Sequence, residues 1–105
     1  MKLIVTSTGK NLESMFDLRF GRSAWFCVFD TETNAVEFIE NSNKNNNSGA
    51  GTKAAEMAAE LKADKVISGD FGPKAKSLLE EFKIQMIILE ERKKTIQEII
   101  ETLKN

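Results

Sequence analysis

The sequence predicts an α/β fold in which three layers, α/β/α, are built around a five-stranded mixed sheet in the element order βββαβαβα. Two observations support this prediction. The first 40 residues contain three short runs rich in β-branched and aromatic residues, separated by turn-forming residues, as is typical of strands. From residue 49 onward, segments with apolar residues at helical spacing alternate with short apolar runs, which is typical of strand–helix–strand units.

The first three elements are predicted to be strands. Leu3-Ile4-Val5 is an uninterrupted apolar run, which indicates a buried first strand. Thr31-Glu32-Thr33-Asn34 has the composition of a turn, so the second and third strands should form a hairpin. The expected strands cover residues 2–8, 24–30 and 35–40, and the expected polar loops cover 9–23 and 41–48.

Three helices and two further strands are predicted in the rest of the chain. Small residues on the first helix allow it to pack close to a sheet, and Pro73 suits the first position of the second helix. The expected strands cover residues 65–68 and 84–89. The apolar positions that define the three helices are Ala50, Ala54, Ala58 and Leu61; Ala75, Leu78, Leu79 and Phe82; and Ile96, Ile99, Ile100 and Leu103.

The element order also predicts where the loops lie. Strand–helix–strand units need right-handed crossovers, so the first, fourth and fifth strands should be parallel, with the second strand antiparallel to its neighbours. The loops at 9–23, 42–49 and 69–73 then share one edge of the sheet, where open α/β sheets bind ligands. The side chains expected in the core are Leu3, Val5, Phe26, Val28, Ile67, Leu78, Ile87 and Ile100.

Composition limits the classes of function. A chain of 105 residues is expected to form a single domain, 1–105, with one core. The net charge of −1 gives no support for nucleic-acid binding, and no apolar stretch approaches the roughly 20 residues of a membrane span. Neither nucleic acid nor membrane is therefore expected as a partner. The single cysteine fits a reducing, cytoplasmic setting, and without histidine no histidine-based triad or metal site can form.

Three glycine-bearing segments form the candidate binding site, and each contains Arg or Lys: residues 19–22, 49–53 and 69–74. Glycine lets a ligand approach the main chain, and a helix that begins beside it directs N–H groups at an anion. We therefore expect no catalytic residue and leave metal ligands unassigned. The expected cofactor-binding residues are Arg19, Gly21, Arg22, Gly49, Gly51, Lys53, Gly72 and Lys74.

Other functions fit these motifs less well. Gly49-Ala50-Gly51 is similar to a dinucleotide-binding fingerprint, with Asp70 about 20 residues on as the ribose-binding acid, but a long loop separates it from its strand. A two-metal nuclease needs a carboxylate on the first strand, which has none. Cys27 stands among apolar residues in a strand, which favours a structural role over metal or redox chemistry.

Taken in order, these segments resemble the dinitrogenase iron–molybdenum cofactor biosynthesis family, the small NifX/NafY-like domains also found at the end of NifB proteins. The resemblance rests on Arg19-Phe20-Gly21-Arg22 before Ala24-Trp25-Phe26, a hairpin ending in Glu40-Asn41, Gly49-Ala50-Gly51 opening an Ala-rich helix, and Gly69 before Gly72-Pro73-Lys74-Ala75. It implies a ribonuclease H-like fold and a non-enzymatic protein that binds or carries an iron–molybdenum or other metal–sulfur cluster or cofactor precursor.

The resemblance also implies how such a cluster would be held. The family often has a histidine at the position of Arg19, and this chain has none. Sulfide-rich clusters are polyanions, so Arg, Lys and backbone N–H groups would hold one by charge. A metalloenzyme or a cofactor-assembly protein is the implied protein partner. Two alternatives remain open here: a regulatory module that binds a nucleotide or phosphometabolite at the same loops, and a protein-interaction adaptor.

Overall fold

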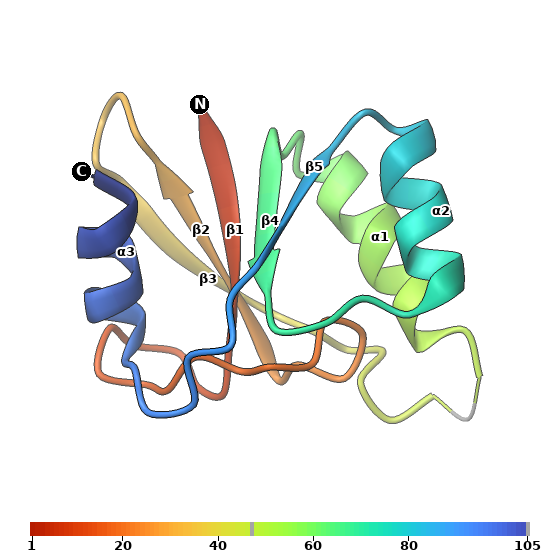
Figure 1. Cartoon of the computed structure of the whole chain (residues 1–105), viewed down its shortest axis with the longest axis horizontal. Helices are drawn as coiled ribbons and strands as arrows, with labels where there is room; N and C mark the ends of the chain where they lie inside the picture. Colours follow the sequence, from red (N-terminus) through yellow and green to blue (C-terminus); the bar gives the residue numbers. More distant parts are fainter. Residues whose placement is uncertain (47, 105) are drawn as a thin grey trace.

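A computed structural model describes residues 1–46 and 48–104; Asn47 of the expected 41–48 loop and Asn105 lie outside the described residues. The eight elements follow the expected order βββαβαβα, and Figure 1 shows them along the chain. The strands are β1 Lys2–Ser7, β2 Trp25–Asp30, β3 Val36–Glu40, β4 Lys65–Ser68 and β5 Gln85–Ile88. The helices are α1 Ala50–Glu60, α2 Pro73–Glu81 and α3 Ile96–Lys104.

The five strands form one mixed sheet in the order β3-β2-β1-β4-β5. Strand β2 is antiparallel to both β1 and β3, whereas β1, β4 and β5 are parallel, as the sequence predicts. Helices α1 and α2 cover one face of the sheet and α3 covers the other (Figure 1). The expected three-layer α/β/α fold is therefore confirmed.

Alternation along the strands divides the core between the two faces. Ile4, Phe26 and Val66 pack with the alanines of α1, whereas Leu3, Val5 and Ile67 pack with the isoleucines of α3. Ala54, Ala55 and Ala58 of α1 are buried, and their small side chains allow the helix to approach the sheet closely. The expected burial of Leu3, Val5, Phe26, Val28, Ile67 and Ile100 is confirmed.

Two core predictions are wrong. Leu78 and Ile87 are only partly buried and lie at the margins of the two cores. Helix α2 turns Ala75 and Leu79 toward the sheet, which leaves Leu78 at the side of the helix. Ile87 is on β5, the last strand of the sheet, so no described strand covers its outer side.

This difference within α2 predicts a difference in stability. Leu79 is completely buried, so Leu79→Ala should lower the free energy of unfolding by about 2–5 kcal/mol. Leu78→Ala removes the same atoms from a partly exposed position and should cost clearly less. Urea unfolding of both variants tests this, and equal losses would contradict the orientation of α2.

Candidate functional site

The carboxyl edge of the sheet carries a cleft of about 390 Å³. It lies where the loops after β1, β3 and β4 meet, as the sequence predicts for the three glycine segments. The residues that line it are Arg19, Phe20, Gly21, Arg22, Gly49, Ala50, Gly51, Asp70 and Gly72. Phe20 is buried, and its ring packs at a tilt against the rings of Phe26 and Phe71. These contacts anchor residues 19–22 to the core beneath the cleft.

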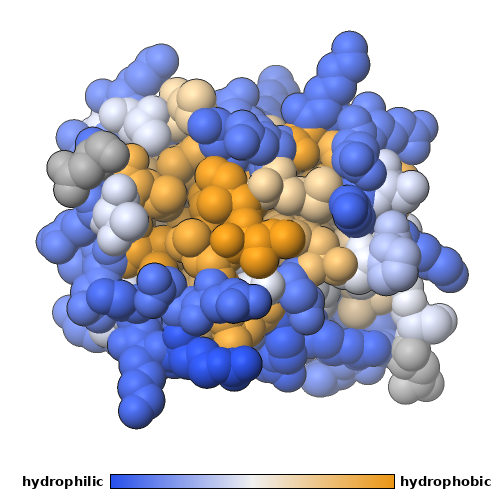
Figure 2. Space-filling model, viewed as in Figure 1, coloured by the Kyte–Doolittle hydropathy of each residue, from blue (hydrophilic) through white to orange (hydrophobic). Residues whose placement is uncertain are grey.

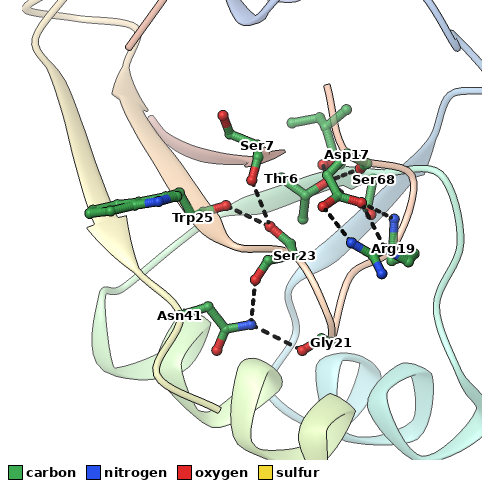
Figure 3. A network of polar contacts seen from close by, with 10 residues as sticks. Thr6, Ser7, Asp17, Arg19, Gly21, Ser23, Trp25, Asn41 and Ser68 are labelled. Atoms are coloured by element: carbon green, nitrogen blue, oxygen red, sulfur yellow. Dashed lines mark hydrogen bonds and ion pairs between the residues drawn. The ribbon is translucent and has the colours of Figure 1, made fainter. Parts of the chain in front are cut away.

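Gly21 brings the first loop into direct contact with the start of α1. A Cβ built on Gly21 would lie 2.8 Å from both Cα and N of Gly51, closer than side chains can approach. Beside this contact, the side-chain amide of Asn41 donates hydrogen bonds to the carbonyls of Gly21 (3.0 Å) and Ser23 (2.8 Å), as Figure 3 shows. Asn41 is fully buried, so both bonds are shielded from water.

The first turn of α1 and the cap residue of α2 border the cleft, and neither helix has a side-chain cap. The cap residue of α1 is Gly49, whose φ of 77° favours glycine, and the cap residue of α2 is Gly72. Neither helix has an acidic residue in its first turn. The first N–H groups of a helix have no intrahelical partner and carry partial positive charge. The cleft therefore faces the N-termini of two helices; in α2 the first residue is Pro73, which has no N–H, so its free donors begin at Lys74.

Gly72 differs from the other glycines of the cleft because neither a packing contact nor a positive φ requires glycine there. A Cβ at this position would meet no atom within 4 Å, and the backbone (φ −64°, ψ 162°) is one that Ser or Asp adopts readily at a helix N-cap. Gly51, by contrast, lies where a Cβ would come within 3.3 Å of Ala75. Glycine at position 72 thus leaves the N-terminus of α2 open.

A buried carboxylate holds Arg19 at the cleft. The Nε atom of Arg19 donates to Oδ1 of Asp17 (3.2 Å) and a terminal nitrogen donates to Oδ2 (3.3 Å), which is the two-point geometry of an Arg–carboxylate pair. The hydrogen bond and the negative charge of Asp17 raise the pKa of Arg19 above its ordinary value. Asp17 is only 5% exposed, and its backbone carbonyl accepts a hydrogen bond from the hydroxyl of Thr6, which is also hydrogen-bonded to the hydroxyl of Ser68 (Figure 3).

Arg22 connects the cleft to the loop after β3. Its guanidinium donates to the backbone carbonyls of Lys44 (2.8 Å) and Asn46. Both contacts use one terminal nitrogen, Nη1, while a guanidinium has five N–H donors in total. Arg22 is exposed, and its charge is held beside the cleft by this loop.

The structure brings together most of the predicted site residues. Arg19, Gly21, Arg22, Gly49, Gly51 and Gly72 line the cleft. Lys74 lines an adjoining hollow of about 270 Å³ that shares Gly49, Gly51 and Gly72 with it. Lys53 borders neither space, because it lies three residues into α1 and pairs with Glu56 at 3.6 Å.

Sequence reasoning missed three polar residues. Asp17 lies two residues before Arg19, a spacing that allows its carboxylate to accept from the Arg19 backbone N–H (3.0 Å), but its burial could not be foreseen. Asn41 was noted as the end of the hairpin and the first residue of a polar loop, with no role at the site. Asp70 was considered only as a ribose-binding acid, whereas it lines the cleft, and its backbone forms an isolated parallel β-bridge with that of Arg19. Its carboxylate opposes an anion at that end of the cleft.

Cys27 lies away from the cleft, in the middle of the sheet between Val5 and Phe38. Its side chain is fully buried, and this burial raises the pKa of the thiol from 9.0 to about 12. Over residues 1–46 and 48–104, no group of three or more Cys, Asp or Glu side chains is arranged to hold a metal ion. In the same residues, no helix has the length and apolar character to cross a membrane.

The fold and the cleft together define a class: a small α/β domain that presents two helix N-termini and two arginines at the carboxyl edge of its sheet. The chain belongs to the dinitrogenase iron-molybdenum cofactor family, whose family model matches residues 1–105. The resemblance seen in the glycine segments is therefore confirmed.

Solved structures of related proteins share the fold. The apo form of the orange protein from Desulfovibrio gigas is 31% identical with a TM-score of 0.90, over 97% of this chain and 85% of that chain. A putative NifB protein from Thermotoga, determined by NMR, is 28% identical with a TM-score of 0.83, over 97% of this chain and 85% of that chain. Among curated proteins, no match to this chain is found.

The contact between Gly21 and α1 can be tested by one methyl group. Gly21→Ala places a Cβ against the backbone of Gly51, which cannot yield as a side chain can, so we expect a loss of about 1–3 kcal/mol in unfolding free energy. Gly72→Ser is the matched control, since its Cβ enters open space. Chemical denaturation of both variants should separate them, and a neutral Gly21→Ala would contradict the contact.

The buried thiol predicts how stability depends on pH. The pKa of Cys27 is higher in the folded protein than in the unfolded chain, so ionisation of the unfolded chain comes first as the pH rises. The unfolding free energy of the parent should therefore fall between pH 9.0 and about 12, by up to about 1.4 kcal/mol per pH unit relative to Cys27→Ala. Denaturation series at several pH values measure this difference, and parallel curves for the two proteins would contradict it.

Proposed function

We propose that this chain is a non-enzymatic protein that binds or carries an anionic metal–sulfur cluster or cofactor precursor in metallocofactor biosynthesis. The observation that supports it most directly is the convergence of two uncapped helix N-termini on one arginine-lined cleft. The family relationship supports a cofactor-related role, and the structure of the D. gigas orange protein is described as an apo form.

The chemistry of the cleft suits an anion held without direct ligation. The chain has no histidine, and its one cysteine, Cys27, is buried in the sheet away from the cleft. Neither residue type can therefore act as a metal ligand in the cleft. Backbone N–H groups of α1 and α2 would donate hydrogen bonds to the sulfides of the cargo. Arg19 and Arg22 would offset its negative charge. Asp17 orients Arg19 and partly neutralises it, which limits the net attraction.

Asp70 helps to define the orientation of the cargo. Asp70 lines the cleft beside Arg19, to which its backbone is paired, whereas the side toward α2 has Lys74 in the adjoining hollow. An anionic cluster would therefore lie toward Gly49, Gly51 and Gly72, away from Asp70. Lys53 is paired on α1 and takes no direct part in this arrangement.

Substitutions at Gly72 test the proposal without disturbing the packing. Gly72→Ser and Gly72→Asp both cap α2 and occupy its N–H groups, but only Gly72→Asp adds a negative charge to the cleft. With tetrathiomolybdate as the probe, added anaerobically, we expect Gly72→Asp to bind at least about tenfold more weakly than Gly72→Ser. Calorimetric titration, with visible absorbance after desalting, measures both affinities.

Two double variants distinguish binding at the cleft from a general effect of positive surface charge. Arg22→Ala with Lys74→Ala removes two charges at the cleft, and Lys53→Ala with Lys76→Ala removes two charges elsewhere on α1 and α2. Only the first pair should weaken tetrathiomolybdate binding, by about tenfold or more. Equal binding by the parent and the cleft variants would place the site elsewhere. Binding of ATP or inorganic phosphate in preference to tetrathiomolybdate would instead support the nucleotide or phosphometabolite alternative.

A further inference from the structure

Strand β5 has an open edge. On one side it is hydrogen-bonded to β4, with the N–H of Gln85 donating to Asp64 (3.1 Å) and that of Leu89 donating to Ser68 (3.0 Å). Backbone groups alternate along a strand, so the N–H and C=O groups of Met86 and Ile88 point away from β4. Within the described part of the chain, no segment pairs with that side.

Apolar side chains surround this open edge. Ile88 is 61% exposed, and Phe82, at the end of α2, is 38% exposed. Figure 2 shows an apolar patch in the middle of the face where β5 crosses the front of the molecule in Figure 1. The partly buried side chains of Met86, Ile87 and Leu89 on and beside β5 continue it. Large apolar patches of this kind mark interaction surfaces.

The opposite edge of the sheet has a different character. Strand β3 carries Glu37 and Glu40, both exposed, among its five residues. Charged residues on an edge strand oppose the approach of a second strand. All four residues of β5 are uncharged: Gln85, Met86, Ile87 and Ile88. Of the two edges, only β5 is suited to strand pairing.

The charges that flank β5 indicate its occupant. Lys83 precedes the strand, and Glu90 and Glu91 follow it, all three exposed. A strand with a cation at one end and acids at the other is complementary to an antiparallel copy of itself. In a two-fold arrangement each Lys83 lies near the acids of the other copy, so both ends of the interface are paired. A second copy of this chain therefore matches the edge in charge as well as in polarity.

The outward backbone groups select the register. Met86 and Ile88 must face each other across the two-fold axis, because each such pair exchanges two N–H···O=C bonds. Ile87 then meets its own copy at the axis, and Lys83, in the turn before the strand, lies near Glu90 and Glu91 of the second copy. A shift of two residues in one direction would pair Met86 with Glu90 and move Lys83 toward Arg92 and Lys93 of the second copy. The reverse shift would oppose Ile88 to Ile84, whose N–H is already bonded to Leu79.

We propose that two copies of this chain associate through antiparallel pairing of their β5 strands, which joins the two sheets into one. The axis lies at Ile87, and Ile88 of both copies contributes apolar contacts beside it. Because the strands are antiparallel, the two clefts at the carboxyl edges of the sheets point in opposite directions. The interface therefore leaves both clefts accessible.

Sedimentation equilibrium of the full chain tests the pairing. We expect a concentration-dependent monomer–dimer equilibrium in the parent. Ile88→Lys adds a charge to the centre of the interface at an exposed position and should weaken the dimer at least about tenfold. Val36→Lys is the matched control, an apolar-to-lysine change on the opposite edge of the sheet, and should leave the dimer unchanged.

Charge reversal tests the register. Lys83→Glu opposes two acids at each end of the interface and should weaken the dimer, whereas Lys83→Glu combined with Glu91→Lys restores the opposite charges and the association. Circular dichroism confirms that each variant is folded. The proposal is overturned if the parent stays monomeric up to about 1 mM, or if Val36→Lys weakens the dimer as much as Ile88→Lys. Failure of the charge swap to restore the dimer would overturn the register.

Discussion

The site depends on one close contact, between the backbone of Gly21 and the first turn of α1 at Gly51. This contact places Arg19, Phe20 and Arg22 beside a helix N-terminus. Asn41 stabilises it from the other side by binding the carbonyls of Gly21 and Ser23. A side chain at position 21 would separate the loop from the helix and open the cleft on that side.

A second constraint acts at the opposite end of the cleft. Thr6 at the end of β1 bonds both Ser68 on β4 and the carbonyl of Asp17, so the loop after β1 is tied to two neighbouring strands. Asp17 in turn holds the guanidinium of Arg19. The position of the Arg19 guanidinium in the cleft therefore depends on residues of β1 and β4 as well as on the conformation of the loop after β1.

The sequence allowed the fold to be predicted because periodicity and element order carry that information. The crossover rule sufficed to place residues 19–22, 49–51 and 72 at one edge, as the cleft shows. Side-chain direction at the margins was less predictable: Leu78 and Leu79 both fit a helical apolar face, and the small rotation that buries Leu79 depends on packing. The burial of Asp17 does not follow from spacing, whereas the i,i+3 spacing of Lys53 and Glu56 on α1 is one at which a helix brings opposite charges together.

The uncapped start of α2 has a consequence for thermodynamics. Serine or aspartate at position 72 would satisfy a backbone donor permanently, and glycine leaves that stabilisation to whatever occupies the cleft. A molecule that binds only the folded state increases the unfolding free energy in proportion to the logarithm of its concentration relative to its dissociation constant. The resistance of this protein to unfolding would therefore report its loading, and the empty form would be the one most readily unfolded and degraded.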